Sequence, residues 1–421
     1  MEAAHQRSPW WWIPSLYFGQ GIPYVVVMTL SVAMYKNTGI SNTDIALYTA
    51  WLYLPWVIKP LWSPVVELLG TKRFWIIALQ LVIGASLAMV ALTTQLPNFF
   101  RTSLAVLWLM AFSSATHDIA ADGFYMLGLR QQQQAAFVGV RSTFYRLAMI
   151  AGQGGLLYLA GQLTDKLGDP HVAWSIVFFI LAAMFAALFV YHFFMLPKPA
   201  TDVRAKAGSD LFREFFATFA AFFRKDGIVV ILGFLLLFRL GEAQLLKLAV
   251  PFLLDPASKG GLGLTTSEVG LVYGTIGVIA LTMGGLLGGV VISRHGLKCC
   301  LWPMAFAVHV PDLVFVYLSS ALPENIYLIS AAMAAEQFGY GFGFTSYMLY
   351  MIMVADGEHK TAHYAICTGF MALGMMLPQM ASGWIQQMLG YQHFFLWVCL
   401  ATIPAFAMTA LIKVDPAFGR E

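Results

Sequence analysis

The sequence is poor in charge. Asp, Glu, Lys and Arg make up only 11% of its 421 residues, whereas about a quarter of the residues are charged in an ordinary soluble domain. Because 59% of the chain is hydrophobic, so small a charged share excludes a water-soluble fold. We therefore expect an all-α membrane protein surrounded by a lipid bilayer.

Cysteine is also scarce, and the cysteines present indicate no chemistry. Cys299, Cys300, Cys367 and Cys399 lack the spacing of metal ligands, so the sequence predicts no metal site, no disulfide and no cofactor. A phosphate-binding loop is missing too, so an ATP-driven pump would require a partner subunit. The first apolar run is a full span rather than a cleavable signal peptide, and we expect it to be retained.

The apolar residues are gathered into blocks long enough to cross a membrane. Residues 74–92 and 172–194 are two examples, and about 20 apolar residues span a hydrocarbon core of ~30 Å. We predict twelve spans, at 10–35, 43–69, 74–93, 103–128, 135–163, 172–195, 228–254, 268–292, 299–320, 325–354, 362–389 and 393–413.

The basic residues between the spans predict the orientation. Fifteen of the 24 Lys and Arg fall in connections on one side, and four, Lys36, Arg101, Lys166 and Lys259, fall on the other. Because cytoplasmic loops are rich in Lys and Arg, we expect a multi-pass protein of the bacterial inner membrane with both termini in the cytoplasm. The net charge of +3 follows mainly from this bias and does not indicate a nucleic-acid partner.

The polar stretch 197–226 divides the predicted spans into six and six. We expect an N-terminal six-helix bundle at 1–196, a cytoplasmic linker at 197–226 and a C-terminal six-helix bundle at 227–421. Within the linker, phenylalanines recur at helical spacing over 211–223. This pattern predicts an amphipathic helix on the membrane surface, and a structural tether is favoured over a regulatory element.

An internal repeat relates the two halves at an offset of 222 residues. Gly152, Gly161 and Gly168 recur as Gly374, Gly383 and Gly390. A duplicated set of six spans joined by a cytoplasmic linker resembles the plan of the major facilitator superfamily, whose halves rock about a central site. The turns at 67–73 and 293–298 also resemble the G-x-x-x-D-R-x-G-R-R loop motif of that superfamily, with Glu67 and Ser293 in place of Asp.

Ionisable residues inside the predicted spans are the first functional candidates, because a charge in mid-bilayer is costly unless it faces a partner or a cavity. Asp118 and Asp122 lie one turn apart in the fourth span, and Arg141 and Arg146 lie in the fifth. If the fourth and fifth spans form an antiparallel hairpin, residues at the same depth in the membrane lie next to each other. Asp122 is then paired with Arg141, and Asp118 with Arg146. Both carboxylates are proton-coupling candidates, with Asp118 the better one because it lies deeper.

Other candidates are spread over both halves. Lys59 lies among three prolines at mid-depth of the second span and is the strongest substrate-site candidate, although an ion pair is the alternative. In the seventh span Arg239 and Glu242 share a face, and Lys247 has no local partner. The anion that Lys247 requires is either the substrate or Glu336 of the tenth span. Glu242 and Glu336 are further proton-coupling candidates.

Polar and aromatic residues near these charges are candidates for binding sugar rings. Gln20, Tyr24 and Tyr145 offer hydrogen bonds and aromatic faces, and His117 stands beside Asp118. Most of the other aromatic residues are expected to be packing or interface residues. A structural, hydrogen-bonded histidine is favoured over a functional role for His117.

Five segments resemble motifs of the AmpG-type muropeptide permeases and the related acetyl-coenzyme A transporters, a branch of the major facilitator superfamily. They lie in both halves of the chain and match, in order, Y-F-x-x-G-L-P, L-P-Y-x-x-K-F-L-W-[AS]-P, T-Q-D-I-A-x-D, E-x-F-x-x-G-x-G and T-x-Q-Y-A. The matching residues are 17–23, 54–64, 116–122, 336–343 and 361–365. At His117 and His363 the family has glutamine.

The resemblance implies a monomeric, proton-driven transporter that imports N-acetylglucosaminyl-anhydro-N-acetylmuramic acid and its peptide derivatives from the periplasm for cell-wall recycling. The alternative is that the same fold imports another amino sugar or oligosaccharide, or moves acetyl-coenzyme A. The two histidines, expected in the cavity, leave the identity of the ligand open between the muropeptide and a neighbouring glycan or amino sugar. An intramembrane enzyme is disfavoured, because His117 and Asp122 diverge by ~140° on a helix. A non-transporting sensor would need an output module, which the sequence does not show.

Overall fold

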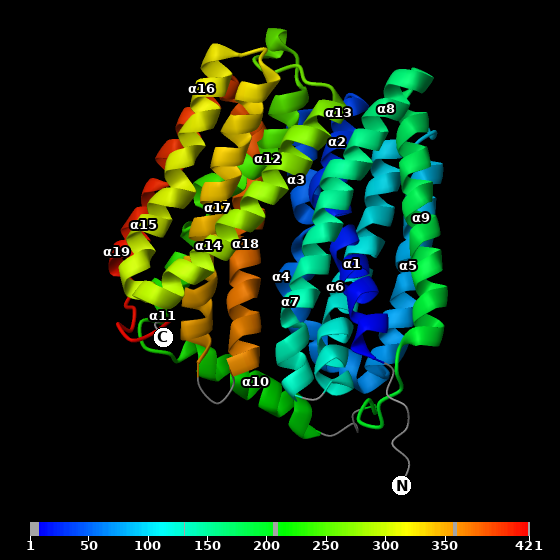
Figure 1. Ribbon diagram of the computed structural model, residues 1–421, viewed down its shortest axis with the longest axis vertical. Helices are drawn as coiled ribbons and strands as arrows, with labels where there is room; N and C mark the ends of the chain where they lie inside the picture. The colour runs from blue at the N-terminus through cyan, green and yellow to red at the C-terminus, as the bar shows by residue number, and fades with distance from the viewer. Residues whose placement is uncertain (1–7, 130, 205–208, 357–359, 420–421) are drawn as a thin grey trace.

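The chain folds into helices that run side by side along one long axis (Figure 1). This computed structural model describes residues 8–129, 131–204, 209–356 and 360–419, and these residues form no β-strand. Twelve spans are present, six on each side of the linker helix α10, Ser209–Phe223. The predicted all-α architecture of two six-helix bundles is confirmed.

Three of the six spans of the N-terminal half are single helices, and two of the others contain π-helical turns. In chain order they are α1 to α2 (Ile13–Val25, Val26–Leu30, Ser31–Asn37), α3 and α4 (Asn42–Trp51, Leu54–Leu69), α5 (Lys72–Thr93), α6 (Phe99–Gly128), α7 to α8 (Gln131–Met149, Ile150–Leu156, Leu157–Leu167) and α9 (Pro170–Met195).

The C-terminal half contains more breaks. Its spans are α11 and α12 (Ile228–Leu237, Leu240–Leu254), α13 to α14 (Thr266–Val269, Gly270–Gly277, Val278–His295), α15 to α16 (Leu297–His309, Val310–Asp312, Leu313–Ala321), α17 (Ile326–Ala355), and the last two spans in α18 and α19 (Lys360–Ala401, Ile403–Leu411).

Length and hydropathy alone identify nine stretches that could cross a membrane in the described part of the chain. One of them, Ala362–Leu411, contains two spans, because the helix turns at Gly390. The second and fifth spans are not among the nine. The second is broken between α3 and α4 and carries Lys59, and the fifth is rich in glutamine at its start. The second span, the fifth span and the extra span within Ala362–Leu411 bring the nine stretches to the predicted twelve spans.

The repeated glycines occupy equivalent places in the two halves. Gly161 of the fifth span abuts Ser267 of the eighth, and its counterpart Gly383 of the eleventh abuts Asn42 of the second. A Cβ at either glycine would overlap atoms of the other half. Small residues let helices approach closely in membranes, so these positions set how tightly the halves join. The predicted repeat is therefore visible in the packing as well as in the sequence.

The third glycine pair lies where helices end in both halves. Gly168 follows α8 with a φ of 69°, and Gly390 turns the chain from the eleventh span to the twelfth with a φ of 70°. A positive φ strains residues that have a Cβ, so both positions favour glycine, although the ψ angles of 5° and 167° differ. The offset of 222 residues therefore relates the fifth and eleventh spans from their middles to their ends.

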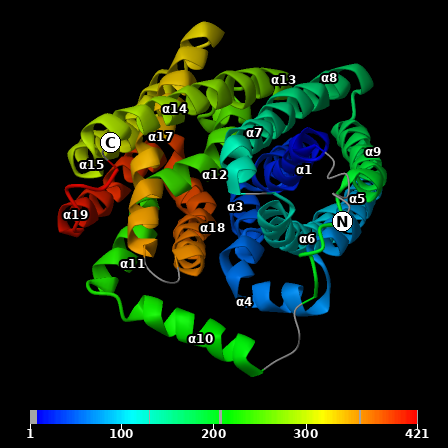
Figure 2. The same ribbon diagram turned by 60° about the horizontal axis from the view of Figure 1, so that its bottom comes forward.

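The linker helix lies at the end of the bundle where both ends of the chain lie, which we call the terminal end (Figure 2). It packs on α4 and α18 and so touches both halves. Phe222 is fully buried, whereas Phe216 is 66% exposed. The helix therefore has the two-faced character that the sequence predicts. Its predicted phenylalanines at 212 and 215 lie outside the described side chains.

Candidate functional site

A small polar cavity lies between the two halves. Its volume is about 120 Å³, below the roughly 300–1,000 Å³ of typical ligand pockets. Both halves supply its walls, from the first and fifth spans on one side and from the seventh, eighth, tenth and eleventh on the other. Its polar lining residues are Tyr24, Thr29, Gln153, Lys247, Tyr273, Gln337, Tyr340 and Gln379.

Lys247 is the only charged residue among the residues that line this cavity. It comes from α12, is 3% exposed, and its Nζ donates a hydrogen bond to Thr49 Oγ1 of α3 at 3.0 Å. No carboxylate lies within ion-pair distance of it among the described residues. Of the two anions that the sequence left open for Lys247, the structure thus excludes Glu336 in this state.

Aromatic rings connect the cavity to the ionisable residues of the N-terminal half. The Tyr24 ring lies 6.1 Å from that of Tyr53 and 6.2 Å from that of Trp56, measured between ring centroids. Trp56 Nε1 in turn donates to Asp118 Oδ2 at 3.0 Å, and Lys59 Nζ lies 4.0 Å from the same oxygen. The predicted candidates Tyr24, Lys59 and Asp118 are therefore brought together at one place.

The predicted pairing of Asp118 with Arg146 is wrong. Asp118 faces Lys59 of α4, whereas Arg146 lies beside Gly285 of α14 in the other half. Equal depth in a hairpin is not sufficient, because direction around the helix matters as well. Asp118 and Asp122 are four residues apart and diverge by about 40°, but Arg141 and Arg146 are five apart and diverge by about 140°.

The other predicted pair, Asp122 with Arg141, is confirmed. Arg141 Nη2 lies 2.9 Å from Asp122 Oδ1, and both side chains are about one-third exposed, at 31% and 36%. The Arg141 guanidinium also lies over the Tyr17 ring, 4.6 Å from its centroid. Arg141 is thus held between α6 and α1 rather than presented to the central cavity.

Arg239 and Glu242 form a fully buried ion pair in the C-terminal half. Arg239 Nε and Nη2 donate to the two Glu242 oxygens at 2.9 and 2.7 Å, and Nη2 also donates to Tyr340 Oη at 2.6 Å. The side chains are only 3% and 1% exposed. A bidentate pair of this kind neutralises both charges, and Tyr340 joins it to the cavity wall.

Behind the same wall lie two further carboxyl groups. Glu336 of α17 is 1% exposed, and its Oε2 accepts a hydrogen bond from the neighbouring Gln337 Nε2 at 2.8 Å. Asp312, at the break between α15 and α16, is equally buried. It was missed at the sequence level, although it is an ionisable residue in the predicted span 299–320 and the rule applied to the others would have identified it.

The two histidines that replace family glutamines do not line the central cavity. His117 is 2% exposed inside the N-terminal bundle, and its Nε2 lies 3.2 Å from Gln80 Nε2. His363 Nε2 donates to the Thr218 carbonyl oxygen of the linker helix at 3.3 Å. The expectation that both histidines occupy the cavity is therefore wrong, because their spans turn these positions toward other helices.

Gln20 and Tyr145 lie close to the site without lining the cavity. Gln20 is 8% exposed on α1, one turn before Tyr24. Tyr145 packs against the neighbouring Gly21, where an added Cβ would lie 3.4 Å from its Cδ2 atom. Both residues therefore lie where α1 and α7 meet, between the cavity and Asp118.

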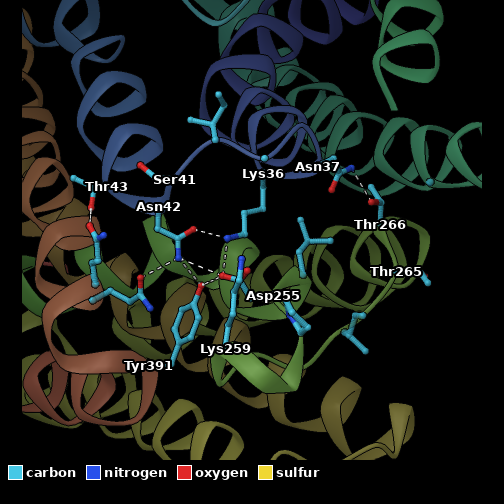
Figure 3. A pocket seen from close by; sticks show the side chains of 18 of the residues that line it. Lys36, Asn37, Ser41, Asn42, Thr43, Asp255, Lys259, Thr265, Thr266 and Tyr391 are labelled. Atoms are coloured by element: carbon cyan, nitrogen blue, oxygen red, sulfur yellow. Dashed lines mark hydrogen bonds and ion pairs between the residues drawn. The ribbon is translucent and has the colours of Figure 1, made fainter. Parts of the chain in front are cut away.

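The end of the bundle opposite the termini, which we call the far end, is closed by a polar network between the halves (Figure 3). Lys36 Nζ lies 2.6 Å from Asp255 Oδ2 and donates to Asn42 Oδ1 at 2.7 Å. Asn42 Nδ2 donates to Gln386 Oε1 at 2.9 Å and to Tyr391 Oη at 2.8 Å, and Tyr391 Oη donates to Asp255 at 2.7 Å. We call these five residues the far-end latch.

A larger cavity of about 870 Å³ surrounds the latch. Figure 3 shows Lys36, Asn42, Asp255 and Tyr391, four of the residues that line it, pointing toward one another. The latch joins residues more than 200 positions apart in the chain. It therefore joins the two halves at this end.

Residues 15–350 match the sequence pattern of the Major Facilitator Superfamily. The chain belongs to this superfamily of membrane transporters. It is 26% identical over 400 residues to "Putative transporter AmpG 4" of Rickettsia conorii, a match that covers 91% of this chain and 92% of that one. It is 24% identical over 413 residues to the "Anhydromuropeptide permease" of Escherichia coli K12, which covers 96% of this chain and 80% of that one.

Solved structures agree on the fold. One is the inward-facing, unoccupied form of a bacterial homologue of the human lysosomal transporter Spinster, with a TM-score of 0.73 and 14% identity over 97% of both chains. The chain is thus a multi-pass membrane transporter of a small-molecule substrate, and its relatives are permeases rather than enzymes.

Proposed function

We propose that this transporter imports anhydromuropeptides across the bacterial inner membrane, with the terminal end in the cytoplasm and the far end toward the periplasm. The observation that carries this proposal is that relatives named for AmpG and for anhydromuropeptide transport match more than nine-tenths of the chain. The central cavity supports it, because its lining suits an anionic sugar.

Lys247 is the proposed contact for a carboxylate of the substrate. It is buried at the interface of the halves, where the Thr49 hydroxyl is its only hydrogen-bond partner among the described residues, and a buried cation is stabilised when an anion reaches it. The cavity also offers the amides of Gln153, Gln337 and Gln379 for sugar hydroxyl and acetamido groups. Tyr24 and Tyr273 supply the aromatic faces.

Asp118 and Lys59 are the proposed proton-sensitive pair of the N-terminal half. Their separation of 4.0 Å is long for an ion pair, and Trp56 supplies the shorter contact to Asp118. When Asp118 takes up a proton, the attraction to Lys59 is lost and the Lys59 ammonium becomes available to a substrate anion. Such an exchange would couple proton uptake to sugar binding.

Alternating access follows from the two cavities. A disaccharide does not fit a space of about 120 Å³, so the central site must widen when the halves rock apart. The far-end latch closes one entrance in this state. Opening it would connect the outer cavity of about 870 Å³ to the central cavity and admit substrate from that side.

The test is uptake of radiolabelled N-acetylglucosaminyl-anhydro-N-acetylmuramic acid into proteoliposomes, with and without an inward proton gradient. Gradient-dependent accumulation is expected, with weak competition from free N-acetylglucosamine, short oligosaccharides and acetyl-coenzyme A. Absence of uptake together with strong competition or uptake of another of these solutes would reassign the substrate.

A matched pair of variants tests the role of Lys247. Lys247→Met removes the cation, and we expect KM for the disaccharide to rise at least about tenfold, the loss of roughly one charge-assisted hydrogen bond. Thr49→Val removes only the present partner of Lys247 and should leave KM within about threefold of the wild-type value. Equal effects of both variants would show that Lys247 acts by packing the halves.

A further inference from the structure

Asp312 is a buried carboxyl group for which the proposed mechanism so far has no use. It ends the short turn Val310–Asp312 that interrupts the ninth span, and it is 1% exposed. Neither of its oxygens has a hydrogen-bond partner among the described residues, and no ion pair reaches it there. A buried carboxylate without partners is strongly disfavoured in a membrane interior.

Glu336 lies against the same turn. The tenth span packs closely on the ninth, so that a Cβ at Gly339 would lie 2.8 Å from Pro311, the residue before Asp312. Glu336 is one turn before Gly339 on the same face of α17. Its Oε1 has no partner among the described residues, and its Oε2 accepts only from Gln337.

The other charged groups around the turn do not neutralise these carboxyls. From α12, Glu242 is paired with Arg239. From α18, which packs on the same turn, Cys399 is a free thiol and brings no positive charge. His309 of α15 is 3% exposed and is packed between the rings of Phe238 and Phe406. Asp312 and Glu336 thus lie in one buried region in which no described cation forms an ion pair with either carboxyl group.

We propose that Asp312 and Glu336 form a proton-binding pair in the C-terminal half, connected to the central cavity through Gln337. Two adjacent buried carboxyl groups without a cation cannot both be ionised, so the pair holds at least one proton. Gln337 lines the cavity and donates to Glu336. A substrate that reorients Gln337 would therefore change how firmly the proton is held.

The pair is distinct from Asp118, which lies in the other half and faces Lys59. The pair lies behind Gln337, which lines the cavity. The proton therefore binds to the two carboxyl groups, while the solute contacts other atoms of the same cavity wall. The existence of the proton-binding pair does not depend on which solute is carried. Its role in coupling rests on the proposed function.

Infrared difference spectroscopy of the purified full-length protein tests the pair without a substrate. At neutral pH the wild-type protein should show a carbonyl stretch of a protonated carboxyl group in apolar surroundings, and the double variant Asp312→Asn and Glu336→Gln should lose it. Asp44→Asn, which removes an exposed carboxylate, should keep it. A spectrum of the double variant that matches the wild type in this region would overturn the proposal.

Transport tests the coupling role separately. In proteoliposomes, Asp312→Asn should lose accumulation of the disaccharide against its gradient, at least about tenfold, while exchange of labelled for unlabelled disaccharide stays within about twofold of wild type. Loss of both activities with an intact infrared band in the wild type would assign Asp312 to packing. If the wild type carries no disaccharide but shows the band, the proposed function fails and the proton-binding pair stands.

Discussion

The two halves share one architecture but place their charges differently. In the N-terminal half, Lys59, Asp122 and Arg141 are each 27% to 36% exposed, and Asp118, the partner of Lys59, is 12% exposed. In the C-terminal half, Arg239 and Glu242 are at most 3% exposed. The interactions of the first group are screened and can rearrange at small cost, whereas those of the second are strong and cannot be left unpaired.

This difference concerns how easily the charged groups of each half exchange partners. Partly exposed charges exchange one partner for another at little cost, because water shares in stabilising them. Fully buried charges are held to their partner, because an unpaired charge in the interior is costly.

The largest effect is expected from breaking the buried pair. Arg239→Gln leaves Glu242 without its bidentate partner, and removing one member of a buried pair costs about 3–5 kcal/mol. We expect a strongly lowered melting temperature and poor yield of the detergent-purified protein.

The double variant Arg239→Met and Glu242→Gln is the control for this prediction. It removes both charges and should recover most of the thermal stability, because buried pairs are replaceable by neutral groups of similar size. If the single variant melted like the wild type, the C-terminal half would not be the more sensitive region and the comparison would fail.

An intermediate effect is expected at the far-end latch. Asp255→Asn replaces the ion pair with Lys36 by neutral contacts, and charge-assisted hydrogen bonds contribute about 1.5–3 kcal/mol. The balance between closed and open far ends should then shift by about 10- to 100-fold toward open. The measurement is labelling of Thr29→Cys, a cavity position, by an impermeant maleimide, with the four native cysteines replaced by serine.

Thr43→Ala provides a matched control, since it removes a more exposed contact between the halves, the hydrogen bond to Gln387. Labelling at Thr29→Cys should change little in that background. Slower labelling in Asp255→Asn than in the unmodified latch would show that Lys36 and Asp255 do not close this end.

The contrast between the halves was partly visible in the sequence. Hydropathy predicts the spans because a membrane demands uninterrupted apolar length, and the glycine register of 222 residues predicts the repeat. The Asp122 and Arg141 pair follows from depth in a hairpin between neighbouring spans. These features depend on the spacing of residues within a span or between neighbouring spans, and this spacing can be read from a single sequence.

Other features depend on direction and on distant neighbours. Depth alone could not show that Arg146 turns away from Asp118 toward Gly285. Lys36 and Asp255 lie 219 residues apart, one in the last turn of α2 and the other directly after α12, and no periodicity connects them. Gln153 and Gln379 carry no charge, so a search for ionisable residues passes over them, although they line the cavity.

The smallest effect is expected where the comparison predicts tolerance, at the Asp122 and Arg141 pair. Exchanging the two residues, Asp122→Arg with Arg141→Asp, keeps an ion pair at a site where both side chains are about one-third exposed. Pairs at such sites contribute up to about 1 kcal/mol, so even Asp122→Asn alone should lower the unfolding free energy by no more than that.

We would measure thermal unfolding and disaccharide uptake of the exchanged variant beside Arg239→Gln. These measurements test whether a partly exposed ion pair tolerates substitution better than a buried one. Stability near that of the wild type, with a smaller loss than Arg239→Gln shows, is the expected outcome. A loss as large as that of Arg239→Gln would mean that the Tyr17 ring, over which Arg141 lies at 4.6 Å, makes this pair as specific as the buried one. Partial exposure would then no longer predict tolerance, and the charges of the N-terminal half would be as firmly fixed as those of the C-terminal half.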